Sequence, residues 1–183
     1  MVHIALLRGI NVGRAKRIAM ADLRSLVEKL GYRDVKTILN SGNVVFTADG
    51  GSAQASAKRI EAALVSQLGI SSKITGLSAA DLATIIDENP LPEATESPSR
   101  FLISVVGNPA DLKRVDGLLD KNWGTERVAV GSRAVYQYSP DGILEGKAVE
   151  AVARALGDTT TARNWATLGK IAVVAEGLRT TAG

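Results

Sequence analysis

The chain has 183 residues, of which 45% are hydrophobic and 22% are charged, and its formal net charge is +3. This composition is that of an ordinary globular protein with its own hydrophobic core. Because the chain has no cysteine and a single histidine, the composition excludes disulfides, cysteine nucleophiles and metal sites made of thiolates or several histidines.

The first predicted element is a strand at residues 2–8, where an apolar run indicates that both faces are covered. The single histidine, His3, lies inside this run. We therefore expect His3 to be a core residue, although any Ser-His-Asp triad in this chain would have to use it. Residues 9–18 follow with two glycines and no hydrophobic period, which predicts a loop.

The rest of the first half is predicted to continue as helix, strand, strand, helix and strand. An apolar stripe followed by Gly31 predicts a helix at 19–30. Ser52 can cap a second helix that reaches Leu68 and is followed by Gly69. Residues 40–43, Asn-Ser-Gly-Asn, predict a hairpin turn. The strands are predicted at 35–39, 44–46 and 70–75. The resulting order, β-α-β-β-α-β, is that of a ferredoxin-like unit.

A further helix and a linker are predicted to separate the two halves. Ser78 and Asp81 have the spacing of a capping box, which predicts a helix start, and this helix should end before Pro90. Residues 89–99 hold three of the five prolines and no periodic pattern. They are therefore predicted to form a linker.

The second half repeats the order of the first. Asn108 and Pro109 predict the start of a helix, and Gly131-Ser132 predicts a second hairpin turn. Strands are predicted at 101–106, 127–130 and 133–138, further helices at 143–156 and about 162–176, and a short strand or cap at 159–163. We therefore expect an α+β fold of two ferredoxin-like halves with antiparallel sheets. They span residues 1–88 and 100–183, and the second has an extra C-terminal helix.

The positive charge gathers in one short segment. The first 21 residues contain no acidic residue, and their basic residues are Arg8, Arg14, Lys16 and Arg17. Removing these four from the 22 basic residues leaves 18 against 19 acidic ones, so the remainder is near neutral at −1. The loop at 9–18 is also long, because the second half has only two residues, 107–108, at the same place. Connections of roughly two to six residues are usual, so its length suggests a function.

These features predict an anion-binding site. In a ferredoxin-like sheet the first two strands run in the same direction, which places the loop at 9–18 beside the hairpin at 40–43. Guanidinium groups, amides, a hydroxyl and glycine backbone are suited to hold a phosphate or carboxylate, and the dipole of the following helix would add to the field. Gly9 and Gly13 match neither a dinucleotide fingerprint nor a P-loop. The candidate ligand-binding residues are Arg8, Gly9, Asn11, Gly13, Arg14, Ser41 and Asn43, with Arg163 and Asn164 from the second half.

Three stretches of the chain resemble one protein family. They are Leu6-Leu7-Arg8-Gly9-Ile10-Asn11-Val12-Gly13, Asn40-Ser41-Gly42-Asn43-Val44-Val45-Phe46 and Ala162-Arg163-Asn164-Trp165. The chain is thereby similar to the family called domain of unknown function 1697 (DUF1697) over nearly its whole length. The resemblance implies an α+β protein of two similar ferredoxin-like halves and no settled activity. The chain departs from the family pattern at Arg14 and Ala166, where the family often has glycine and asparagine.

Three classes of function fit these observations. The leading hypothesis is a module that binds a small anionic or phosphate-bearing ligand at residues 8–17 and 41–43. The second is a metal-independent enzyme at the same site, although the sequence shows no paired carboxylates or activated serine. The third is an interaction module, either a homodimer or a binder of nucleic acid. Single-stranded RNA is not favoured because only 4% of the residues are aromatic. A solvated loop beside a plain turn is the structural alternative.

The sequence contains no segment typical of a membrane protein. No apolar run approaches the roughly 18 residues of a membrane span. The run after Met1 stops at Arg8, which is too short for a signal peptide. We therefore expect a cytoplasmic protein with no membrane contact, and no motif calls for a metal or another cofactor.

Overall fold

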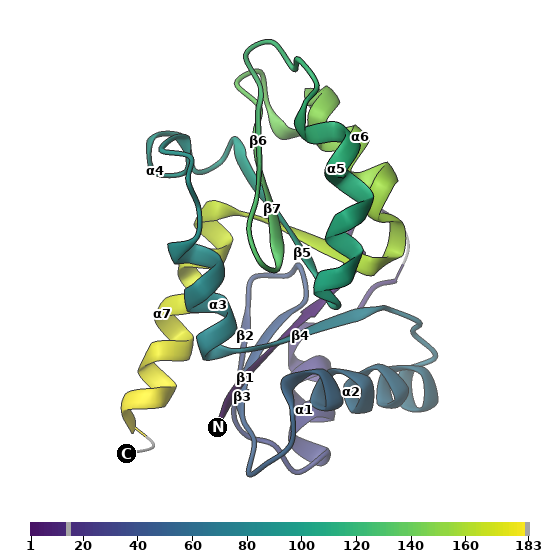
Figure 1. Ribbon diagram of the computed structural model, residues 1–183. Coiled ribbons are helices and arrows are strands. Elements are labelled where there is room, and N and C mark those ends of the chain that lie inside the picture. Colours follow the sequence, from purple (N-terminus) through teal and green to yellow (C-terminus); the bar gives the residue numbers. More distant parts are fainter. Residues whose placement is uncertain (14–15, 182–183) are drawn as a thin grey trace. The chain divides into compact units, whose positions relative to one another are not determined.

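The structure is a computed structural model that describes residues 1–13 and 16–181 (Figure 1). Its residues form two compact units, one of Thr84–Gly169 and one of Met1–Ala83 together with the C-terminal residues from Lys170 onward. The repeat-based division into residues 1–88, 89–99 and 100–183 stays a prediction. No helix in the described part of the chain is long and apolar enough to cross a membrane.

The first unit contains a four-stranded antiparallel sheet. Its central strand, β1 (Val2–Leu7), pairs with β3 (Asn43–Thr47) on one side and with β4 (Ile74–Ser78) on the other. The strand β2 (Arg33–Ile38) pairs with β3 and completes the order β2-β3-β1-β4. β1 therefore connects both edges of the sheet, and the loop that follows it begins at the sheet centre.

Local hydrogen bonds set the starts of two helices in the first unit. At the start of α2 (Ala53–Leu68), the Ser52 hydroxyl accepts from the Ala55 N–H at 3.1 Å. At the start of α3 (Ala79–Asp87), the Ser78 hydroxyl accepts from the Asp81 N–H at 3.0 Å, and the Asp81 carboxylate accepts from the Ser78 N–H at 2.7 Å. Both caps were predicted from the sequence and are confirmed. The helix α1 (Met20–Lys29) differs, because no side chain caps its start.

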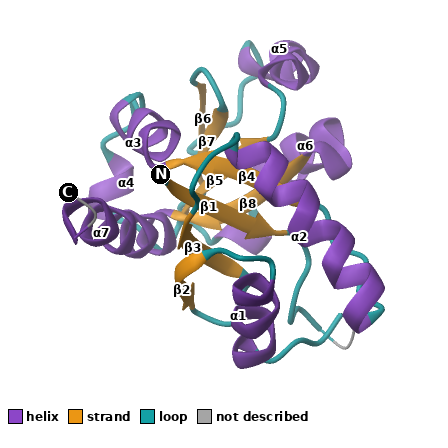
Figure 2. Cartoon of the chain, turned by 90° about the horizontal axis from the view of Figure 1, so that it is seen from below, coloured by secondary structure: helices purple, strands orange, loops and turns teal. Residues whose placement is uncertain are grey.

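The second unit contains another four-stranded antiparallel sheet, in the order β6-β7-β5-β8 (Figure 2). Its strands are β5 (Phe101–Val106), β6 (Arg127–Val130), β7 (Ala134–Tyr138) and β8 (Thr160–Asn164). Its helices are α4 (Glu93–Glu96), α5 (Asp116–Leu119), α6 (Lys147–Leu156) and the start of α7 (Trp165–Thr181), with 3-10 turns at Pro109–Val115, Ile143–Glu145 and Gly157–Thr159. The predicted α+β class with two antiparallel sheets is confirmed.

The fourth strand does not lie where the sequence predicts it. The apolar run predicted a strand at 70–75, whereas β4 spans Ile74–Ser78. Pairing with β1 decides the position, because Leu77 lies opposite Ile4 across the sheet. Ile70 instead packs against the core without joining the sheet.

The last two predicted helices also have different bounds. The final helix was predicted from about residue 162 but begins at Trp165, because residues 160–164 pair with β5 as β8. The helix predicted at 143–156 is interrupted at Gly146, where an added Cβ would lie 2.3 Å from the Ser139 hydroxyl oxygen. After this break the Glu126 carboxylate caps α6 by accepting from two main-chain N–H groups.

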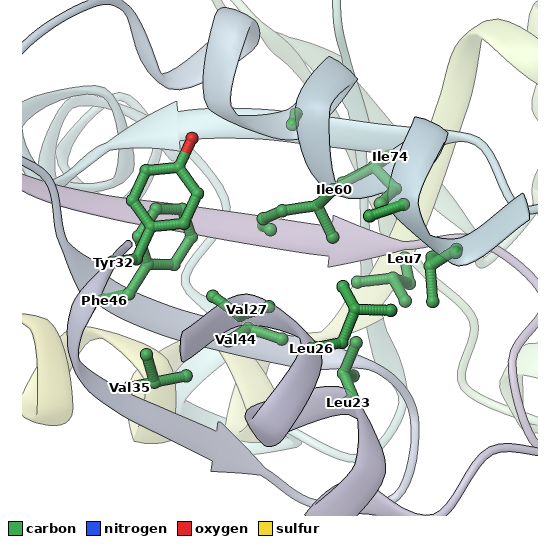
Figure 3. Packing of buried hydrophobic residues seen from close by; sticks show 14 of the residues in the cluster. Leu7, Leu23, Leu26, Val27, Tyr32, Val35, Val44, Phe46, Ile60 and Ile74 are labelled. Atoms are coloured by element: carbon green, nitrogen blue, oxygen red, sulfur yellow. The ribbon is translucent and has the colours of Figure 1, made fainter. Parts of the chain in front are cut away.

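The core of the first unit lies between one face of its sheet and the helices α1 and α2 (Figure 3). The strands contribute Leu7 and Phe46, and the helices contribute Leu23 and Ile60. The Tyr32 ring packs on the Phe46 ring with centroids 4.5 Å apart. Burial of these apolar groups is the main force holding the helices to the sheet, and it fixes the strand ends from which the basic loop leaves.

His3 is a core residue, as the sequence predicts. It is 2% exposed, its Nδ1 lies 3.0 Å from the Ser56 hydroxyl of α2, and its ring packs edge-on against Phe46. Burial lowers the pKa of His3 below its ordinary value of 6.5, because the charged imidazolium is poorly solvated there.

We expect Gly76→Ala to destabilise the first unit. A Cβ at this position would lie 2.2 Å from the carbonyl oxygen of Ala53, a main-chain atom that cannot move without shifting α2. The free energy of unfolding should fall by at least ~2 kcal/mol, as measured by urea denaturation. Gly177→Ala is the control, since nothing lies within 4 Å of its Cβ inside α7, and it should stabilise by about 0.5–1 kcal/mol. Equal effects of the two changes would contradict this packing.

The free energy of unfolding should also depend on pH through His3. The folded protein holds the pKa of His3 below 6.5, so the unfolded chain binds more protons once the pH falls below about 6.5. Stability from this group is therefore fully present above that pH and is lost as the pH falls toward the folded pKa. Urea denaturation between about pH 7 and pH 5 should show a steeper decline for the wild type than for His3→Gln. Parallel curves would show that His3 is not the group responsible.

Candidate functional site

The loop at 9–18, called here the basic loop, lies against the hairpin turn at residues 40–43. The Leu7 N–H at the end of β1 donates to the Gly42 carbonyl at 2.8 Å. The Asn11 side chain in the loop donates to the Asn40 carbonyl at 2.8 Å. A Cβ on Gly42, whose φ is +76°, would lie 2.8 Å from the Leu7 Cβ. The turn therefore needs glycine both for its backbone conformation and for this close approach.

Asn11 holds the basic loop closed. Its side-chain oxygen accepts from the Ile18 N–H at 3.0 Å, and its side-chain nitrogen donates to the Ile18 carbonyl at 2.9 Å. Its main-chain N–H donates to the Lys16 carbonyl at 3.2 Å. Asn11 has φ +56°, a left-handed conformation that asparagine tolerates better than most residues. The structure thus gives Asn11 a positioning role at the base of the loop.

Asn43 has a similar role in the hairpin. It is completely buried, and its side-chain nitrogen donates to the Ile38 carbonyl at 2.8 Å and to the Ser41 hydroxyl at 3.0 Å. These bonds join the ends of β2 and β3 across the turn. Asn43 and Ser41 therefore shape the surface against which the basic loop packs.

An open cavity of about 440 Å³ lies where the basic loop, the hairpin turn and α1 meet. Its lining residues are Asn11, Arg17, Ile18, Ala19, Met20 and Asn40. Ala19 is the N-cap residue of α1 and makes no side-chain hydrogen bond. The first N–H groups of a helix have no partner within the helix, and the positive end of its dipole lies there. The cavity therefore combines main-chain donors with positive potential.

Among the described residues, Arg17 is the charged side chain that lines this cavity, and Lys16 and Arg8 lie nearby in the sequence. Arg17 is exposed and donates one hydrogen bond to the Gly13 carbonyl at 2.6 Å, and a guanidinium has further N–H donors for a ligand. Lys16 is also exposed. Arg8 is half-buried, and its main chain is fixed by bonds to Ser72 and Lys73. The acidic residue in the first turn of α1 is Asp22.

The predicted site residues divide between the two units. Arg8, Gly9, Asn11, Gly13, Ser41 and Asn43 lie in the first unit, around the basic loop and hairpin turn, and Arg14 lies outside the described residues. Arg163 and Asn164 belong to the second unit. The sequence did not single out Asn40, Ala19 or Met20. A signal for Ala19 and Met20 was present in the sequence. No Ser, Thr, Asp or Asn directly precedes the apolar stripe of α1, which indicates a helix start without a side-chain cap.

Arg163 and Asn164 have well-defined local partners. Arg163 lies on β8, is 8% exposed and donates to the Thr161 hydroxyl at 2.9 Å and to the Ala162 carbonyl at 2.8 Å. Burial lowers the pKa of Arg163 to about 10. The Asn164 side chain accepts from the Thr167 N–H at 2.8 Å and so caps α7. Their membership of an anion site stays a prediction.

Comparisons with known proteins identify a family and a similar fold. The family model described as "Protein of unknown function (DUF1697)" matches residues 1–136. The solved structure of conserved bacterial protein SP0830 from Streptococcus pneumoniae is similar, with a TM-score of 0.77 and 23% sequence identity over 95% of this chain and 98% of that chain. At this identity the likeness shows the fold alone. No curated protein matches. Because the family model covers well over half of the sequence and agrees with the motifs described above, the chain belongs to the DUF1697 family.

Proposed function

We propose that this protein binds a small anionic or phosphate-bearing ligand at residues 8–17, beside the hairpin residues 41–43. The observation that carries the proposal is the open cavity of about 440 Å³ shared by the basic loop, the hairpin turn and the uncapped start of α1. The ligand would place its phosphate or carboxylate at the helix N-terminus. Arg17 would pair with it from the wall of the cavity.

The electrostatic setting supports an anion over a cation or a neutral ligand. The first 21 residues hold four basic side chains and no acidic one. The helix N-terminus adds main-chain donors, and hydrogen bonds from charged or aligned donors to an oxyanion are stronger than neutral ones. Arg8 and Arg14 stay candidates for further pairing with the anion.

The second unit offers an internal comparison for the uncapped helix. There, the residue after β5 and Gly107 is Asn108, whose side chain accepts from the Ala110 N–H at 3.1 Å and caps the following turn. In the first unit the ten-residue basic loop occupies this place, and the residue after it, Ala19, supplies no cap. An exposed helix start without a cap gives up about 0.5–2 kcal/mol of stability. The uncapped start of α1 therefore favours ligand binding at a cost in the stability of the fold.

The glycines and amides of the site would act by positioning. Gly9 and Gly13 have φ of +64° and +60° and nothing within 4 Å of their Cβ positions, so the backbone there is open to a ligand. Asn11, Ser41 and Asn43 would hold the loop and the turn in place through the bonds described above. The basic loop and the hairpin turn, held in place by these residues, would orient the ligand.

We also propose that each half is a ferredoxin-like unit. The element order β1-α1-β2-β3-α2-β4 and the strand order β2-β3-β1-β4 support this for the first half. The order β6-β7-β5-β8 supports it for the second half, in which a 3-10 turn and α5 stand where the first helix would be.

Replacing Arg17 should weaken anion binding. Arg17→Gln removes a charge-assisted hydrogen bond of roughly 1.5–3 kcal/mol, so the affinity should fall at least about tenfold. Calorimetric titration with inorganic phosphate, sugar phosphates and nucleotides at fixed ionic strength measures it. Arg24→Gln is the matched control, because Arg24 is an exposed arginine on α1 that does not line the cavity. Equal losses in both variants, or no binding of any of these anions to the wild type, would overturn the proposal.

Replacing Asp22 should have the opposite effect on binding. The Asp22 carboxylate lies in the first turn of α1, where it repels an anion and also stabilises the helix dipole. Asp22→Asn should therefore tighten anion binding by about two- to fivefold and lower the free energy of unfolding by about 0.3–1 kcal/mol. Titration and urea denaturation test the two effects separately. Glu28→Gln, near the other end of α1, should not tighten binding; if it does so equally, the effect is one of net charge alone.

A further inference from the structure

A second cavity, of about 350 Å³, lies in the first unit away from the basic loop and shares no lining residue with the first cavity. It lies where β1 begins and β3 ends, and the start of α3 and the end of α7 complete its wall. Its lining residues are Met1, Val2, His3, Thr47, Ser78, Ala79, Ala80 and Arg179. The side chains that line this cavity differ in chemistry from those of the first cavity.

Thr47 is the unusual member of this cavity. It is 6% exposed, and its hydroxyl oxygen is buried with no hydrogen-bond partner among the described residues. A buried hydroxyl without a partner costs free energy, which valine in the same shape would avoid. The Thr47 hydroxyl is therefore a free hydrogen-bonding group at the wall of the cavity.

The strand register shows on which side of the sheet this hydroxyl lies. Thr47 is directly opposite Val2, and the next residues, His3 and Phe46, are also opposite one another. His3 and Phe46 face the core side, where His3 contacts Ser56 of α2. Because side chains alternate along a strand, Thr47 and Val2 project from the other face. Figure 2 shows the C-terminal end of α7 on that side of the first sheet, away from α1 and α2.

The other polar groups of the cavity determine which charge a bound ligand can carry. The Ser78 hydroxyl is occupied, because it donates to the Asp81 carboxylate at 2.7 Å and accepts from the Asp81 N–H. Arg179 contributes a guanidinium, and its partner Glu176 lies 3.0 Å away in an exposed pair on the same helix. Such surface pairs contribute little, so a ligand can share the guanidinium. Met1 also lines the cavity, and its ammonium group donates to the Ala48 carbonyl at 2.8 Å. These cationic groups and the Thr47 hydroxyl favour a negatively charged ligand.

We propose that this cavity binds a small aliphatic monocarboxylate. The carboxylate accepts a hydrogen bond from the Thr47 hydroxyl and pairs with Arg179, while a short apolar body lies against Val2, Ala79 and Ala80. The small side chains of the two alanines leave room for such a body. A phosphate is a poorer match, because its additional oxygens would face the apolar side chains of Val2, Ala79 and Ala80.

The test uses sodium butyrate as the probe, with sodium chloride at equal ionic strength as the reference. Butyrate should raise the melting temperature of the wild type and shift the amide NMR signals of Thr47 and Ala80. Butyramide, which has the same shape without the charge, should do neither. Absence of a butyrate effect, or an equal effect of butyramide, overturns the proposal.

The variant Thr47→Val shows whether the Thr47 hydroxyl binds a ligand or stabilises the fold. Without ligand, this variant should melt at a higher temperature than the wild type, and its response to butyrate should be lost. Thr160→Val is the matched control, because the Thr160 hydroxyl donates to the Val105 carbonyl at 2.9 Å. It should melt at a lower temperature and keep the response of the wild type. A lower melting temperature for Thr47→Val would show that its hydroxyl has a structural partner and would falsify the inference.

Arg179→Gln tests the charge. Butyrate affinity should fall by about tenfold, in line with the loss of one charge-assisted contact. Arg154→Gln is the matched control, since Arg154 forms an exposed pair with Glu150 on α6 and does not line the cavity. Equal losses in the two variants would mean that butyrate responds only to net charge, and the proposed site would be wrong.

Discussion

The side-chain amide of Asn11 makes the hydrogen bonds on which the candidate site depends. Its three bonds to main-chain groups of Ile18 and Asn40 join the end of the basic loop, the start of α1 and the hairpin turn. The asparagine amide offers two N–H donors and a carbonyl acceptor on one short side chain, and asparagine also accepts φ +56° at this place. These hydrogen bonds hold the basic loop, the hairpin turn and the start of α1 in position around the cavity.

Element ends that local chemistry decides could be predicted from the sequence. Ser52, Asn108 and the Ser78–Asp81 pair each cap a helix or turn through a bond that spans at most three residues. Strand ends are different, because a partner distant in the sequence decides them. The run at 70–75 has the right composition for a strand, yet the pairing of Leu77 with Ile4 places β4 later in the chain.

The basic loop and the hairpin turn could be placed side by side from the sequence, but the use of their polar groups could not. That Asn11 and Asn43 orient a ligand stays a prediction from the sequence; in the structure their amides bond to main-chain carbonyls of the loop and the turn. Which partner an amide finds depends on the folded chain around it. The unpartnered Thr47 hydroxyl was invisible for the same reason, since its surroundings come from residues far apart in the sequence.

The grouping of the C-terminal residues with the first unit has a consequence for synthesis on the ribosome. The second unit comes from one continuous stretch that ends at Gly169, so all its residues are synthesised before Lys170. The first unit lacks the residues from Lys170 onward until the whole of the second unit has been synthesised. Domains generally fold as soon as their residues emerge. The first unit is therefore completed after the second, and the cavity lined by Thr47 and Arg179 forms only once Arg179 has been added.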